Sequence, residues 1–312
     1  MKQQTIMDLD LRPSPLPNAP QADWHPSRSI GLAALQALHQ ELSAYPKPGL
    51  VSPVDSGSHR DMNAATFFRS LFSLRSYFRE IAGAGMNNAP FAVLKQLGIA
   101  AEERMLKATQ GVNTHRGAIF NLGLLAAAAG HLQASNRSFK RDALAEVIRV
   151  RWGAAIRQHG TLLPNTSHGS QIAASYGIGG ALYEASSGFP HLFGVGLPAL
   201  EKSLEHGADS NSAAVQCLFS LIEVLPDTNL LYRGGEAGLA FAQESARSFL
   251  SAGGVHRSGW QIHADKIHQQ FIGLNLSPGG SADLLAATLF VNYLQSMAYL
   301  KRSSQEQIQN RT

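Results

Sequence analysis

Residues 30–42 read IGLAALQALHQEL, and this stretch carries the pattern that decides the fold. Its apolar residues recur mostly at three- and four-residue spacing, which places them on one face of an α-helix. Pro46 and Pro48 end the helix, because each proline lacks a backbone donor and restricts the residue before it. The stretch therefore predicts a helix from about Ser27 that packs one apolar face inward. The residues of that face are Ile30, Leu32, Leu35, Leu38 and Leu42.

The same period recurs along the chain, and we find no convincing run of alternating residues that would predict a strand. Phe67, Leu71, Leu74 and Phe78 share one stripe within residues 63–81, and Ala118–Ala129 is almost wholly apolar. We expect an all-α fold, a single multi-helix globular domain over residues 27–305 with functional loops between its helices. Residues 159–190, rich in Gly and Ser, are predicted to be largely loop or broken helix. The other predicted helices are 90–110, 140–157, 197–205, 211–224, 235–251, 256–271 and 281–300.

Residues 1–26 are predicted to form an extended or disordered leader, because they hold Pro13, Pro15, Pro17, Pro20 and Pro26. They contain no apolar core typical of a signal peptide, and the apolar run 122–129 is too short to span a bilayer. The single cysteine, Cys217, cannot form an internal disulfide and is predicted to be a small core residue. These features predict a cytoplasmic protein with no membrane partner.

Charged residues make up only 15% of the chain, against roughly 25% in an average protein. Low charge predicts extensive burial of helix surfaces, either against each other or against a second subunit in a homodimer. The net charge of +4 is not gathered into a basic stripe, so we expect no nucleic-acid partner. The excess suits a pocket for an anionic small molecule, although solvated surface charge is the commoner explanation.

The loop 46–62, PKPGLVSPVDSGSHRDM, concentrates prolines, glycines and charges of both signs. Its glycines allow close approach to a ligand, and Asp55, His59 and Asp61 could supply Mg²⁺ ligands and a general base. The alternative is a proline turn in which Ser56 or Ser58 caps the following helix. Spacing alone slightly favours that structural alternative.

A second loop, GVNTHRG at 111–117, precedes the apolar helix. Free backbone N–H groups and cationic side chains at a helix start are typical of an anion site, and Arg116 can bind phosphate in a bidentate way. The alternative is an ordinary cap by Asn113 or Thr114. The two interpretations are compatible. The segment lacks the spacing of a Walker loop.

Three further segments combine turn residues with acids or glycines: 176–190, 226–235 and 277–283. Asp227 and Asp283 lie near predicted helix starts, where negative charge is favourable. The Gly-x-Gly run at 177–179 follows no strand, which argues against a dinucleotide fold. Each segment alone is more often structural, but five such loops in one helical chain indicate a site. The histidines outside these loops lack zinc spacing, and most of them are interpreted as surface or core residues. They are His25, His39, His131, His159, His168, His191, His206, His256, His263 and His268.

Taken together, these segments resemble the triphosphoribosyl-dephospho-CoA synthases, which make the prosthetic-group precursor of citrate lyase and malonate decarboxylase. The resemblance runs from about Ile30 to Leu300 in family order. The sequence of residues 51–59 looks more like the sequences of the malonate decarboxylase branch. Arg116 stands where the family often has Lys. The matching segments are Glu41, 46–51, 57–62, Phe67, Ser70, 111–115, 117–120, 184–190, 227–229, 233–235 and 277–283.

The resemblance implies that ATP and 3′-dephospho-CoA react to give 2′-(5″-triphosphoribosyl)-3′-dephospho-CoA and adenine, and that the product goes on to an acyl carrier protein. It implies a transferase, with Mg²⁺ held by Asp55 and Asp61. Glu41, Asp55, His59 and Asp61 are the predicted catalytic residues. The predicted substrate-binding residues are Lys47, Gly49, Asn113, Thr114, His115, Arg116, Glu184, Asp227, Asn229, Arg233 and Asp283.

Breakage of an N-glycosidic bond builds positive charge at C1″, so the reaction needs a nearby carboxylate, help for the leaving adenine and a base for the ribose 2′-hydroxyl. Two rival interpretations remain open. A non-catalytic helical module that binds an anion or nucleotide would use the loops only as caps and turns. A kinase or ATPase would release ADP instead of adenine.

Overall fold

The computed structural model describes residues 25–162 and 168–309 of the chain, and these residues contain helices and no strand. The all-α prediction is confirmed. Pro26 is the first residue of the first helix, one residue before the predicted start. The rest of the predicted leader, residues 1–24, lies outside the described residues.

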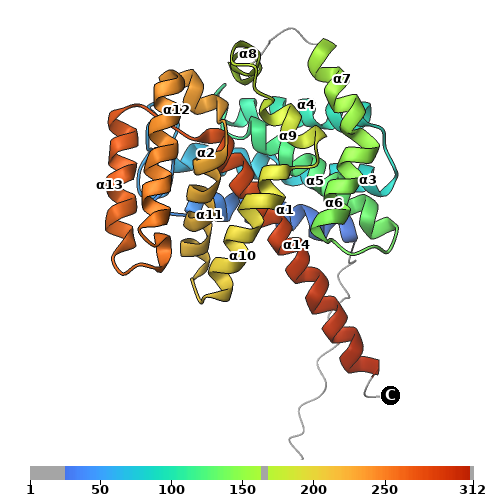
Figure 1. The fold of residues 1–312 in the computed structure, drawn as a ribbon. Coiled ribbons are helices and arrows are strands. Elements are labelled where there is room, and N and C mark those ends of the chain that lie inside the picture. Colours follow the sequence, from blue (N-terminus) through green and yellow to red (C-terminus); the bar gives the residue numbers. More distant parts are fainter. Residues whose placement is uncertain (1–24, 163–167, 310–312) are drawn as a thin grey trace, which may run out of the picture.

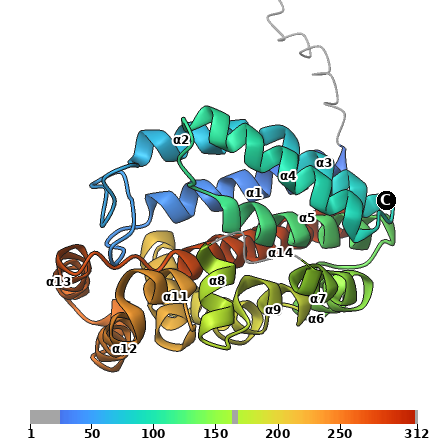
Figure 2. The same cartoon turned by 90° about the horizontal axis from the view of Figure 1, so that it is seen from above.

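The helices form three layers (Figures 1 and 2). In Figure 2 a central layer of α1, α5 and α14 lies between α2–α4 on one side and α6–α13 on the other. The central helices are α1 (Pro26–Ser43), α5 (Arg116–Ala134) and α14 (Gly279–Gln309). One outer layer holds α2 (Ala64–Ser73), α3 (Arg75–Met86) and α4 (Phe91–Ala108). The other holds α6 (Arg141–Val147), η1 (Ile148–Trp152), α7 (Gly153–Leu162), α8 (His168–Ser175), α9 (Gly180–Ser186), η2 (Leu192–Gly196), α10 (Leu197–Glu205), α11 (Ser210–Val224), α12 (Thr228–Ser251), η3 (Gly254–His256) and α13 (Trp260–Gly273).

Helix α5 is the centre of the core, and most of its residues are buried. It approaches α3 closely because both helices present glycine at the contact. A Cβ on Gly85 would lie 1.9 Å from the carbonyl oxygen of Ala127, and one on Gly130 would lie 2.0 Å from that of Ala82. The apolar pattern of 118–129 therefore reports a helix surrounded by protein on most sides.

By length and composition alone α5 could cross a membrane, and so could the bent pair of α11 with residues 228–256 if it counted as one span. The most apolar window of α5 is 72% buried inside the fold. It packs between α1, α3, α4 and α14, as a core helix does. Cys217 is also buried, as predicted, and burial raises the pKa of its thiol to about 12.

Several predicted boundaries differ from the structure. Residues 63–81 form two helices instead of one, with a break at Leu74 (φ −93°, ψ 0°). Helix α12 starts at Thr228, before the predicted start at Gly235, and Gly235 forms a kink with φ +62° that glycine tolerates. Helix α13 starts at Trp260, after a short 3₁₀ turn. Residues 159–190 are broken helix, as predicted, in the part of that range that the structure describes.

Candidate active site

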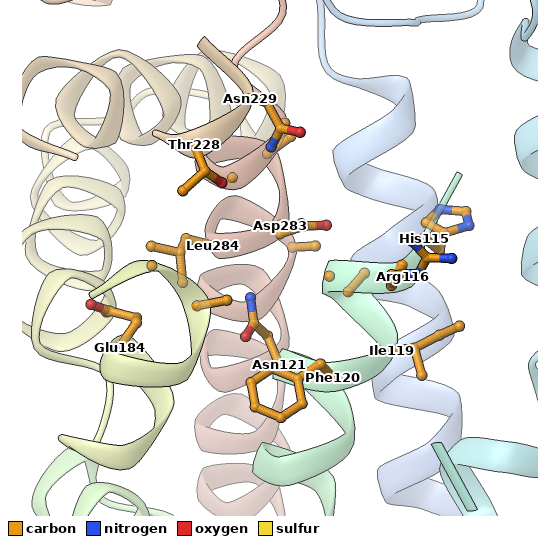
Figure 3. Close-up of a pocket in the computed structure, with 18 of the residues that line it drawn as sticks. His115, Arg116, Ile119, Phe120, Asn121, Glu184, Thr228, Asn229, Asp283 and Leu284 are labelled. Carbon is orange, nitrogen blue, oxygen red and sulfur yellow. The ribbon is translucent and has the colours of Figure 1, made fainter. Parts of the chain in front are cut away.

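The predicted functional loops meet around one cavity of about 930 Å³. The cavity lies where the C-terminal end of α1 meets the N-terminal ends of α5, α9, α12 and α14. Figure 3 shows side chains of α5, α9, α12 and α14 around this space. The predicted residues that line it are Glu41, His59, Asn113, Thr114, His115, Arg116, Glu184, Asp227, Asn229, Arg233 and Asp283.

Four predicted residues do not line the cavity: Lys47, Gly49, Asp55 and Asp61. Gly49 has a structural reason for being glycine, since its φ is +64° and a Cβ would lie 2.0 Å from the carbonyl oxygen of Leu276. The predicted capping role of Ser56 or Ser58 is wrong, because Asn63 caps α2. Ser58 instead donates its hydroxyl hydrogen bond to the Leu276 carbonyl at 2.6 Å.

Asp55 lies behind the cavity wall in contact with His268 of α13. The Nε2 atom of His268 lies 3.0 and 3.1 Å from the two carboxylate oxygens, and the backbone N–H of Gly57 donates to Oδ1. The His268 side chain is fully buried, and its Nδ1 lies 2.6 Å from the carbonyl oxygen of Lys47. His268 thus attaches the loop 47–57 to α13, a role that the sequence pattern did not predict.

Glu41 and Lys47 form a buried ion pair. The Nζ atom of Lys47 donates to Glu41 Oε1 at 2.7 Å and to the Glu41 backbone carbonyl at 2.6 Å. The side chain of Lys47 is 1% exposed and that of Glu41 is 7% exposed. Glu41 lines the cavity and Lys47 does not, so Lys47 supports the Glu41 carboxylate from behind the cavity wall.

Arg233 and His59 bring polar groups to the wall formed by α12 and the start of α14. The Arg233 guanidinium donates to the Ser58 and Asn275 carbonyls and to His59 Nδ1, at 3.1 to 3.2 Å. The Nε2 atom of His59 lies 3.0 Å from the Ser277 hydroxyl oxygen. Burial and the nearby Arg233 charge lower the pKa of His59 to about 4. His59 is therefore neutral at pH 7, with both ring nitrogens engaged.

The loop 109–115 contributes His115, which is 3% exposed. Its Nδ1 lies 2.6 Å from the Ser70 hydroxyl oxygen, while its Nε2 makes no hydrogen bond within the described part of the chain, although the residue lines the cavity. Burial and the Lys47 charge lower the pKa of His115 to about 3. Among the described residues, the buried hydroxyl of Thr114 is also without a partner. Unpaired buried polar atoms are rare in folded proteins, so both atoms are available to a ligand in the cavity.

Asn113 and Arg116 define the start of α5. Asn113 accepts a hydrogen bond from the Arg116 backbone N–H at 3.2 Å. Asn113, one of the two predicted capping residues, therefore contributes to the helix start. The Arg116 guanidinium donates from Nε to Glu102 of α4 at 2.5 Å. Its charge in the cavity is therefore partly neutralised by a neighbouring carboxylate.

Asp227 holds the starts of two helices together. It caps α12 through the Asn229 N–H, and it also accepts from the N–H groups of Gly280 and Ser281 at the start of α14. The Ser281 hydroxyl donates to the same carboxylate. Both carboxylate oxygens of Asp227 accept hydrogen bonds from these groups, so Asp227 fixes the geometry of the cavity wall.

Asp283 serves a different helix from the predicted one. Instead of the start of its own helix, it lies at the start of α5, where the Ala118 backbone N–H donates to its carboxyl group. A Cβ on Gly117 would lie 1.8 Å from Asp283 Oδ2, so the glycine makes room for this carboxyl. Burial, then the negative charges of Glu41 and Asp227, raise the pKa of Asp283 well above its usual range. The cavity thus contains a carboxyl group that binds a proton unusually tightly.

Glu184 and His191 form a further pair. Glu184 is 4% exposed and accepts hydrogen bonds from the His191 ring at 2.7 Å and from the His191 and Leu192 backbone N–H groups. The hydrogen bond to Glu184 raises the pKa of His191, against the effect of burial. His191, which we interpreted as a surface or core residue, therefore belongs to the cavity wall.

The lowered pKa of His115 predicts a pH-dependent contribution to stability. In the folded state His115 stays neutral down to about pH 3, whereas in the unfolded chain it takes a proton below its ordinary pKa of 6.5. The unfolded state binds more protons in this window, so the contribution is present above pH 6.5 and is lost as the pH falls.

We therefore expect wild-type protein to lose about 1.4 kcal/mol per pH unit below pH 6.5 relative to a His115→Gln variant. Urea unfolding of both proteins between pH 7.5 and 4.5 measures this difference. A constant difference over the whole range would contradict the assignment.

A cavity lined by groups with strongly shifted pKa values is a candidate active site, and comparison with known proteins gives its class. Residues 27–302 match the family model described as "CitG: ATP:dephospho-CoA triphosphoribosyl transferase". The chain belongs to this family of transferases.

Named relatives support the assignment. The 2-(5''-triphosphoribosyl)-3'-dephosphocoenzyme-A synthase of Pectobacterium atrosepticum is 40% identical over 259 residues, which cover 81% of this chain and 84% of the relative. The "Probable 2-(5''-triphosphoribosyl)-3'-dephosphocoenzyme-A synthase" of Acinetobacter calcoaceticus is 40% identical over 262 residues, which cover 84% of this chain and 89% of the relative. No solved structure matches the chain.

Proposed function

We propose that this transferase moves the 5-triphosphoribosyl group of ATP to the 2′-hydroxyl of 3′-dephospho-CoA, releases adenine, and serves the acyl carrier protein of a malonate decarboxylase in the cytoplasm. The wording of residues 51–59 supports this pathway over the citrate lyase pathway. The two pathways are distinguished by attachment of the completed prosthetic group to each purified carrier protein, that of malonate decarboxylase and that of citrate lyase. A homodimer remains a prediction from the low charge content.

One observation supports the proposed chemistry. Glu41 and Asp283 line the same cavity, but Glu41 has a cationic partner, whereas Asp283 is buried near other negative charges. Lys47 forms a buried ion pair with Glu41, while burial and the Glu41 charge raise the pKa of Asp283 and favour its protonated form. Two carboxyl groups with different protonation states are the usual equipment for breaking a glycosidic bond.

In the proposed reaction Asp283 acts first as an acid and then as a base, and Glu41 stabilises the charge between the two steps. The C1″–N9 bond of ATP breaks with its electron pair going to adenine, and Asp283 gives its proton to the leaving base. The Glu41 carboxylate stabilises the positive charge on C1″. The 2′-oxygen of dephospho-CoA then bonds to C1″, and its proton returns to Asp283. The net result transfers one proton from the hydroxyl to adenine.

The anionic parts of the substrates need positive or hydrogen-bonding partners. Arg233 has no carboxylate within ion-pair distance in the described part of the chain, and the Nε2 atom of His115 is without a partner. We assign these two groups to the triphosphate of ATP. The triphosphate must be held in place while none of its phosphoryl groups transfers, so positioning is the main requirement.

Mg²⁺ is proposed to enter with ATP. Residues 25–162 and 168–309 contain no group of three or more His, Cys, Asp and Glu that could hold a metal. Asp61 is the better of the two predicted ligands, because its side chain is 64% exposed and lies 3.8 Å from His59. Both oxygens of Asp55 are already near His268. One carboxylate plus phosphate oxygens is a usual ligand set for Mg²⁺. The ion would neutralise part of the charge of the triphosphate.

The decisive experiment is incubation of the pure protein with ATP, Mg²⁺ and dephospho-CoA, followed by chromatography for free adenine. We expect adenine and the triphosphoribosylated product in equal amounts. Omission of dephospho-CoA is the control. Release of ADP in place of adenine contradicts the proposal.

Asp61→Ala is expected to abolish adenine release while leaving the helical circular dichroism unchanged, because Asp61 is exposed and packs against nothing in the core. Asp142→Ala, at an exposed site on α6, is the matched control and should retain activity. A Mg²⁺ titration of both variants completes the test. Wild-type turnover in Asp61→Ala at all Mg²⁺ concentrations removes Asp61 from the site.

A further inference from the structure

A buried amide interrupts the most apolar helix of the protein. Asn121 is the only polar residue within Ala118–Ala129, and it is 3% exposed. Its carbonyl oxygen Oδ1 makes no hydrogen bond with any residue that the structure describes. A buried acceptor without a partner weakens the fold, so an apolar residue would serve α5 better on structural grounds alone.

The Asn121 side chain lies in the cavity wall next to the proposed proton donor. Gly117 and Asn121 are four residues apart on α5 and therefore share one helix face. The Asp283 carboxyl lies against Gly117. In Figure 3 the Asn121 amide points from α5 toward α14, on the side of Asp283 and Leu284.

Apolar residues of α5 and α14 also line the cavity: Phe120, Leu124, Leu284 and Ala286. A space with apolar walls and an amide suits a nucleobase, which has flat apolar faces and polar edges. An asparagine amide can accept from the N6 amino group of adenine and donate to N7. A base with a carbonyl at position 6 places an acceptor against the Asn121 oxygen.

We propose that Asn121 recognises the leaving adenine of ATP through its N6 and N7 atoms and sets the base specificity of the reaction. The inference rests on the proposed function. Asp283 is the proposed proton donor to the leaving adenine, so the part of the cavity next to Asp283 should hold that base. The adenine of dephospho-CoA does not leave and needs no proton donor. Asn121 thereby holds the base at the carboxyl that protonates it.

The test compares ATP with inosine triphosphate, which has a carbonyl in place of the N6 amino group. Wild type and Asn121→Leu are assayed with dephospho-CoA, and free adenine or hypoxanthine is measured. We expect Asn121→Leu to lower kcat/KM for ATP roughly 10- to 100-fold and to change kcat/KM for inosine triphosphate little. The preference for ATP should therefore nearly disappear.

Two controls separate recognition from folding. Asn292→Leu changes an asparagine of α14 that does not line the cavity, and it should keep the wild-type preference. The melting temperature of Asn121→Leu should equal or exceed that of wild type, because the variant removes an unpaired buried acceptor. An acceptor analogue, dephospho-CoA with hypoxanthine in place of adenine, reports on the other base.

An unchanged ATP preference in Asn121→Leu overturns the inference. So does a loss of discrimination confined to the acceptor analogue, which would assign Asn121 to the base of dephospho-CoA. If wild type releases no adenine, the proposed function fails. Calorimetric binding of ATP and inosine triphosphate to wild type and Asn121→Leu then still decides whether Asn121 recognises the base.

Discussion

Replacement of Asp283 by asparagine is expected to abolish most adenine release and, at the same time, to stabilise the protein at neutral and alkaline pH. The loss of activity follows from the proposed role, because asparagine cannot give a proton to adenine or take one from the 2′-hydroxyl. General acid–base catalysis usually contributes about 10²- to 10⁴-fold to a rate. We expect kcat to fall by a factor in that range.

The gain in stability follows from the raised pKa of Asp283. In the unfolded chain this group loses its proton above an ordinary pKa of 3.8, whereas in the folded protein it keeps the proton to a much higher pH. The folded state binds more protons in this window, so the stability that Asp283 contributes is present below pH 3.8 and is lost as the pH rises through the folded-state pKa. Asparagine accepts the same Ala118 N–H bond and does not titrate.

Thermal unfolding of wild type and Asp283→Asn between pH 4 and 9 measures the stability effect, and the pH profile of kcat measures the catalytic one. The difference in melting temperature should grow with pH. Wild-type activity should fall at alkaline pH, where Asp283 loses its proton, and the residual activity of the variant should not show this fall. Asp227→Asn is the contrasting control, since weakening a cap shared by two helices should lower the melting temperature. Wild-type activity in Asp283→Asn contradicts the proton-donor role.

The second large effect is expected for Lys47→Met, and it concerns stability first. The variant leaves the Glu41 carboxylate buried without its partner, and breakage of a buried ion pair in this way usually costs roughly 3–5 kcal/mol. The family resemblance implies that Lys47 binds substrate. The structure instead places its ammonium group against Glu41, outside the cavity lining.

The double variant Lys47→Met with Glu41→Gln distinguishes the two roles. If Lys47 supports Glu41, the second substitution restores much of the lost free energy of unfolding, because no unpaired charge remains, while activity stays low without the Glu41 carboxylate. Urea unfolding and the adenine assay give the two readouts. A stable Lys47→Met protein with only a raised KM for ATP would show direct contact with the triphosphate instead.

Much of the fold could be predicted from local sequence alone. The helix that begins at Pro26, the apolar helix α5 and the helix at Leu197–Glu205 lie where three- and four-residue spacing placed them, because periodicity and proline positions act within one or two helical turns. The break at Leu74 was missed, since the apolar stripe continues across it and only the packing of α2 and α3 in different directions requires it.

The sequence by itself determined the helical class, the loops that carry the polar motifs and the resemblance to one family. Only the tertiary structure decided which motif residues reach the cavity. Lys47 is buried against Glu41, and the half-buried Asp55 pairs with His268, so neither lines the cavity, whereas Asp283 crosses from α14 to the start of α5. The physical reason is that burial, charge pairing and pKa shifts depend on groups brought together from distant parts of the chain, which no local spacing records. Asn121 illustrates the difference, because its oxygen is unusual only once its surroundings are known to offer it no partner.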